Sequence, residues 1–162
     1  MDAAAKLAGF FAAHGIWCVS DGEVLIPLLG IESGDGTRKM LRLASDQAEQ
    51  GVAEGKEKLS QNPDGAARAV LVYDGFVTFE GGKLDALLVD FHLYGELPRS
   101  VLMAVPYRPS GDPKGFAVHR PKFLSFTGPE PDFEAVGKSF FEGVDCHEKG
   151  AKVWNECLDE SQ

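Results

Sequence analysis

The sequence predicts an α+β domain in which a mainly antiparallel sheet of about five to seven strands packs N-terminal, middle and C-terminal helices on one face. Three observations carry this prediction. Three β-rich runs form a central meander over residues 67–108, at 67–80, 83–95 and 100–108. Helical spacing of apolar residues occurs at both ends of the chain, and a helix-start pattern lies in its middle. The 162 residues are 44% hydrophobic and 25% charged, which fits one globular domain.

The N-terminal part of the chain predicts a helix followed by short strands. Over residues 2–14 apolar side chains recur at helical spacing, and Gly15 follows where a helix can end with a left-handed residue. Residues 16–32 contain two apolar runs around a Ser-Asp-Gly turn, which predicts a hairpin. Alternation over residues 37–44 predicts a further strand with one solvated face.

A helix is predicted in the middle of the chain. Asp46 and Glu49 have the spacing of a capping box, so the helix is expected over residues 46–61. Gly51 and Gly55 lie four residues apart and would allow this helix to approach a sheet closely. Each glycine also weakens the helix by roughly 1 kcal/mol relative to alanine.

The second run of the meander has two chemically different faces. Gly81-Gly82 precedes it and is typical of a two-residue hairpin turn. Leu87, Val89, Phe91 and Leu93 share one face, which we assign to the core, because alternate side chains of a strand point the same way. The opposite face carries three chemically active side chains, which are Asp90, His92 and Tyr94.

The last part of the chain predicts one strand and one helix. Residues 115–126 are expected to add a strand that Pro121 places partly at an edge. Residues 132–143 show helical spacing after an acidic first turn. From about residue 144 the chain is expected to be a polar tail, so that residues 1–162 form a single globular domain with this tail.

The charge of the chain is segregated. The net charge is −9, yet residues 97–129 carry five cations against Asp112 alone, a net of +4, which leaves −13 for the remainder. This segregation favours an anionic ligand or an acidic partner surface. The candidate ligand-binding residues are Arg99, Arg108, His119, Arg120, Lys122 and Tyr107, with Phe116, Phe123 and Phe126 as further stacking surface. The structural alternative is that these cations pair with the acidic remainder, where an exposed pair contributes about 0–1 kcal/mol.

The face with Asp90, His92 and Tyr94 is the candidate catalytic site. Residues two apart on a strand lie about 6.5–7 Å apart on the same side, so the three side chains can surround one ligand. His92 would act as acid and base, Asp90 would orient it, and Tyr94 would donate a hydrogen bond. The structural alternative is the solvated face of an antiparallel sheet.

Several function classes are disfavoured. The net charge of −9 disfavours nucleic acid as a partner, and no apolar run approaches the roughly 20 residues that cross a bilayer, so no membrane is expected. Three cysteines without a CxxC favour a reducing, cytoplasmic location. No phosphate-binding loop is present, and the set His14, Cys146, His147 and Cys157 lacks zinc-ligand spacing, so we expect no cofactor and no metal.

Three functional hypotheses remain. The first is a non-catalytic binding or assembly module of a cytoplasmic protein, either as a single chain or as a homodimer, that uses residues 97–129 and the second face of the sheet. The second is a small cofactor-free enzyme or ligand-binding domain for an anionic small molecule, with His92 and Asp90 in the site and Arg108 holding the anion. The third is an acidic inhibitor of a basic partner, in which Glu130 and its acidic neighbours mimic phosphates.

Overall fold

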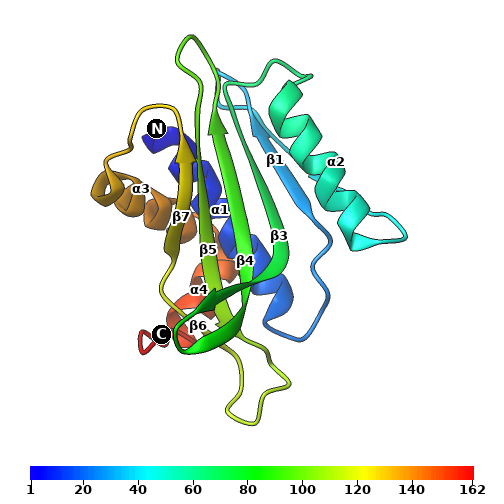
Figure 1. Cartoon of the computed structure of the whole chain (residues 1–162), viewed down its shortest axis with the longest axis vertical. Coiled ribbons are helices and arrows are strands. Elements are labelled where there is room, and N and C mark those ends of the chain that lie inside the picture. Colours follow the sequence, from blue (N-terminus) through cyan, green and yellow to red (C-terminus); the bar gives the residue numbers. More distant parts are fainter.

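The computed structural model describes residues 1–162 and confirms the α+β class. A seven-stranded antiparallel sheet has the strand order β2-β1-β3-β4-β5, and both β6 and β7 pair with β5 (Figure 1). The strands are β1 (Leu28–Glu32), β2 (Arg38–Arg42), β3 (Arg68–Phe79), β4 (Gly82–Leu93), β5 (Arg99–Arg108), β6 (Ala117–Val118) and β7 (Lys122–Thr127). The helices are α1 (Asp2–Val19), α2 (Ala48–Gln61), α3 (Phe133–Asp145) and α4 (Glu148–Glu156).

The predicted meander is confirmed as β3, β4 and β5, three neighbouring antiparallel strands. Phe79 pairs with Gly82, so the two-residue turn is Glu80-Gly81, one residue earlier than the predicted Gly81-Gly82. Leu87, Val89 and Phe91 are fully buried, which confirms the face of β4 that was assigned to the core.

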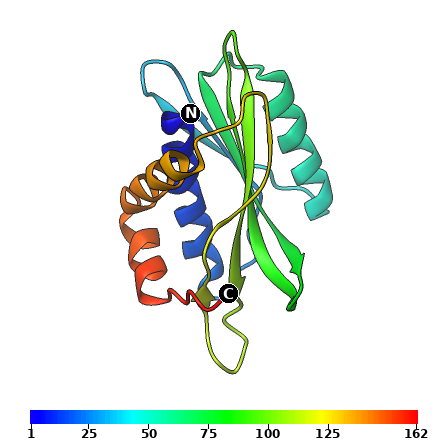
Figure 2. The same cartoon turned by 60° about the vertical axis from the view of Figure 1, so that its left-hand side comes forward.

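The main core lies between the sheet and three helices. α1, α3 and α4 cover one face, and Figure 2 shows them on one side of the sheet with α2 on the other. α1 and α3 cross with their backbones in contact, since a Cβ atom at Gly9 would overlap the Phe140 carbonyl and one at Gly143 would overlap the Lys6 carbonyl. Glycine at both positions sets the distance between the two helices.

The middle helix was predicted on the same face as the terminal helices, and that placement is wrong. α2 covers the opposite face, where Leu59 packs with Leu29, Leu43, Ala69 and Leu71 in a second, smaller core. The physical reason lies in β3, whose consecutive residues 70–72 are all fully buried because the strand is covered on both sides. The expected close approach at Gly55 does occur, since a Cβ there would lie 2.5 Å from Leu71.

The N-terminal helix is longer than predicted, and the hairpin over residues 16–32 does not form. α1 runs through Gly15 to Val19, and only residues 28–32 of that segment make a strand. Gly15 does not end the helix, because it is the point where α1 approaches β4: a Cβ there would lie 2.8 Å from Leu87. Burial of Ile16 and Val19 against the core then continues the helix past this glycine.

The C-terminal part holds more structure than predicted. α3 confirms the predicted helix, and the Asp132 side chain accepts a hydrogen bond from the Ala135 amide as its N-cap. The expected polar tail instead contains α4, whose Trp154 is 1% exposed and packs against Phe140. The single strand expected over 115–126 is divided into β6 and β7.

None of the helices combines the length and apolar character needed to cross a bilayer.

Candidate functional site

Asp90 and His92 lie together on the second face of the sheet, and Tyr94 serves a different purpose. His92 Nε2 lies 3.0 Å from Asp90 Oδ1, and both side chains are partly exposed. The Tyr94 hydroxyl donates to the Leu59 carbonyl at 2.6 Å, and burial raises the pKa of Tyr94 to about 12. Tyr94 therefore holds α2 against the sheet. Asp90 and His92 line none of the five surface hollows described for this chain, so they lie on open sheet.

The candidate cations do not converge on one anion site. Arg99 and Arg108 stand at opposite ends of β5, and at about 3.3 Å per residue they are roughly 30 Å apart. Arg108 Nε donates to the Gly115 carbonyl at 2.7 Å, and its terminal nitrogen lies 3.5 Å from Asp159. Arg120 lies 3.6 Å from Glu160. These last two arginines therefore face acidic residues of the C-terminal segment.

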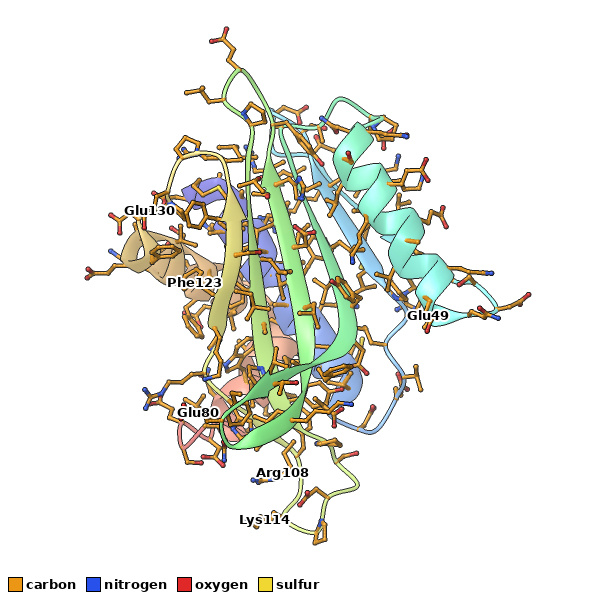
Figure 3. The ribbon with its side chains drawn as sticks, viewed as in Figure 1. Glu49, Glu80, Arg108, Lys114, Phe123 and Glu130 are labelled. Carbon is orange, nitrogen blue, oxygen red and sulfur yellow. The ribbon has the colours of Figure 1, made fainter.

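Backbone pairing also holds the C-terminal segment against β6. The Val118 amide donates to the Cys157 carbonyl at 2.9 Å, and the Asp159 amide donates to the Val118 carbonyl at 2.8 Å. His119 is buried, and its Nδ1 donates to the Asp159 carbonyl at 2.9 Å. Figure 3 shows Arg108 and Lys114 at this lower end of the molecule. The arrangement favours a structural role for this half of the basic stretch.

Tyr107 is committed to a partner within the chain. Its hydroxyl donates to Asp74 at 2.7 Å. Burial raises the pKa of Tyr107, and Asp74 raises it further; burial likewise raises the pKa of Asp74. The nearby hollow of about 320 Å³ is lined by Lys83, Arg108 and Lys114 but also by Asp85 and Asp112. Because residues of both charges line this hollow, it is poorly suited to bind an anion.

The strand β7 exposes a group of apolar side chains at the edge of the sheet. The exposed fractions are 38% for Phe123, 44% for Leu124, 41% for Phe126 and 36% for Phe133. The Phe133 ring, from the start of α3, lies 4.8 Å from the Phe123 ring and 6.0 Å from the Phe126 ring. With Ser125 they line a shallow hollow of about 350 Å³. We call these four apolar residues the β7 edge surface.

A bulge in β7 explains why these side chains gather. Val101 pairs with Phe126 and Met103 with Phe123, and the register shift between them leaves Leu124 without a partner on β5. The extra residue turns both phenylalanines to the face of α3. The sequence had marked Phe123 and Phe126 as stacking residues but missed Leu124 and Phe133. The signal that could have identified Leu124 is the apolar pair Phe123-Leu124, which breaks the alternation of apolar and polar residues expected in a regular strand.

The two edges of the sheet differ in character. β2 has the sequence Arg-Lys-Met-Leu-Arg, so three of its five residues are cationic, which discourages another strand from adding to this edge. β7 carries one cation, Lys122, and three large apolar residues. Pro121 and Pro129 bound its free backbone at either end, because proline cannot donate to a ladder. Only the edge at β7 is therefore open to strand addition.

A pair of histidines lies where α1 meets α4. His147 is the N-cap of α4, and its Nδ1 accepts a hydrogen bond from the Gly150 amide at 2.9 Å. The proton of neutral His147 is then on Nε2, which donates to Nδ1 of His14 at 3.0 Å. Burial lowers the pKa of both residues, and their proximity lowers that of His14 further. The cap therefore requires neutral imidazoles.

We expect this pair to make the fold sensitive to acid. In the unfolded chain both histidines take up protons near pH 6.5, whereas in the folded chain their pKa values are lower, so stability falls as the pH drops below about 6.5. Thermal unfolding monitored by circular dichroism from about pH 7.5 to 5 measures this slope. His147→Asn keeps an N-cap acceptor that does not titrate, so its slope should be shallower. Equal slopes in both proteins would contradict the assignment.

No family model, curated protein or solved structure matches this chain. Tyr94, Tyr107, Arg108 and His119 are engaged within the chain. The β7 edge surface combines exposed apolar groups with an unpaired strand.

Proposed function

We propose that this chain is a non-catalytic binding module that recognises an extended segment of a protein partner at the β7 edge surface. The observation that carries the proposal is an unpaired edge strand with exposed apolar side chains along it. An edge strand presents unpaired amide and carbonyl groups, and an added strand pairs with them while its side chains fill neighbouring hollows. The surface lies mostly within residues 97–129, the stretch in which the sequence predicts a partner.

The chemistry of the surface defines the expected partner segment. Phe123, Phe126 and Phe133 offer aromatic faces on the side of α3, so the partner strand should present apolar side chains at alternate positions on that side. The free backbone between Pro121 and Pro129 limits the ladder to residues 122–128. The module should therefore bind short strand-forming peptides of about six residues.

A selection of displayed peptides tests this proposal. Random peptides are selected on the full chain, and the affinity of enriched peptides is measured by fluorescence polarisation. Leu124→Lys places a charge in the surface and should weaken binding by about tenfold or more. Met40→Lys is the matched control, because Met40 is 41% exposed on the opposite edge strand β2, and it should leave the affinity unchanged. Peptides that bind both variants equally would contradict the proposal, as would a failure to enrich peptides on a chain that is monomeric at the concentration used for selection.

A further inference from the structure

We infer that the segment bound at the β7 edge surface is β7 of a second copy of this chain, paired antiparallel about a two-fold axis. This inference rests on the proposed function, because it names the occupant of the same surface. Three features of the chain support it: the register that the bulge allows, the aromatic residues that this register brings together, and the charges at the two ends of the strand.

The bulge at Leu124 selects one register for self-pairing. Residues that pair across two strands must point to the same face. Phe123 and Phe126 both face α3, whereas Lys122 and Thr127 pair with Ala104 and Ser100 on the opposite face. An axis between residues 124 and 125 sets Phe123 opposite Phe126 of the other copy and Lys122 opposite its Thr127. Shifting this register by one residue would oppose side chains of different faces.

This register covers the exposed apolar groups of both copies. Phe123 of each copy would lie against Phe126 of the other, and aromatic cross-strand pairs of this kind stabilise antiparallel ladders. The two Phe133 rings flank these pairs, because each already contacts Phe123 and Phe126 of its own chain. The sheet would continue from one copy into the other, which leaves the cationic strands β2 as the two outer edges.

The charges at the ends of β7 are self-complementary. Lys122 stands at its start and Glu130 follows its end by three residues, and neither forms an ion pair within the chain. Figure 3 shows Phe123 and Glu130 along the same margin of the molecule. Antiparallel pairing brings Lys122 of each copy to the end where Glu130 of the other lies. Complementary charges at an interface favour this register and orientation over others.

Sedimentation equilibrium of the full chain over a concentration series tests the inference. The natural sequence should form dimers. Lys122→Glu and Glu130→Lys should each weaken the dimer by about tenfold, because each places like charges together at both ends of the paired strands. An equimolar mixture of the two variants should regain the affinity. In the mixed dimer the two substituted positions face each other with opposite charges at one end, and the unchanged Lys122 faces the unchanged Glu130 at the other. Lys39→Glu, on the exposed edge β2, is the matched control and should not change the dimer.

The outcomes separate this inference from the proposed function. Recovery in the mixture supports the second copy at β7, and circular dichroism of each variant shows that loss of the dimer is not loss of the fold. A monomeric natural chain, or a mixture without recovery, overturns the inference. If displayed peptides still bind in a manner that Leu124→Lys weakens, the binding module stands and its occupant is another protein. If the chain is monomeric and no peptide binds in this manner, both the inference and the proposed function are wrong.

Discussion

Gly143→Ala is expected to lower the free energy of unfolding by about 3 kcal/mol, because it inserts a methyl group where two helix backbones touch. A Cβ at this position would overlap the carbonyl of Lys6 in α1, and α1 meets α3 in the same way at Gly9. A backbone carbonyl cannot rotate away as a side chain does, so the helices must separate. Their separation loosens Phe140 and Val144 in the main core.

Urea unfolding measures this effect, and the same helix supplies a matched control. Gly137 also lies in α3, but a Cβ there would meet nothing within 4 Å. Gly137→Ala should therefore raise the free energy of unfolding by up to about 1 kcal/mol through helix propensity. The same substitution in one helix is thus expected to have opposite signs at two positions. Equal stability of the two variants would show that the helices do not cross at Gly143.

Glu32→Gln is expected to cost up to about 3 kcal/mol, because it removes the buried central charge of an ionic triad whose Arg38 reaches the surface. Glu32 is 6% exposed and lies on β1 directly opposite Arg38 of β2 and Arg68 of β3. Its carboxylate accepts hydrogen bonds from both arginines, the one from Arg38 at 2.5 Å. Without the carboxylate, two guanidinium groups would face each other across three strands with no anion between them.

The triad also predicts a dependence on pH. Burial alone would raise the pKa of Glu32, but the hydrogen bonds and charges of Arg38 and Arg68 outweigh burial and hold the pKa below the usual 4.5. Its stabilisation is therefore present above about pH 4.5 and is lost as the pH falls through the lower folded-state value. Unfolding free energies measured from about pH 6 to 3 should fall less steeply for Glu32→Gln than for the natural chain. Glu54→Gln, at an exposed position of α2, is the control and should follow the natural chain.

The sequence predicted the strands of the meander and the face of β4 that enters the core. Leu87, Val89 and Phe91 alternate with the opposite face, and this period of two residues is a local property that each segment carries by itself. The helix that begins after Asp132 was also predicted, because its acidic first turn and its apolar spacing lie within one segment. Local patterns were therefore sufficient for most strands and helices.

Contacts between distant segments decided the rest. Glycine is a residue type that commonly ends helices, yet close packing of Gly15 against Leu87 on β4 keeps this glycine inside α1. Trp154 belongs to a polar segment, and the Phe140 ring of α3 gives it a buried site.

The candidate site was predicted only in part for the same reason. The sequence placed Arg99 and Arg108 in one basic stretch, but an extended strand carries them to opposite ends of the sheet. It marked Phe123 as a stacking residue and placed part of its strand at an edge through Pro121, but it did not bring Phe133 of α3 beside that edge.

The sequence by itself determined the strands of the meander, the helix that follows Asp132 and the apolar face of β4, because these depend on near neighbours along the chain. The tertiary structure decided that α2 covers the second face, that the cations near β6 hold the C-terminal segment, and that β7 is left open. These outcomes depend on strand order and on the free energy of burying surfaces from segments far apart in the chain.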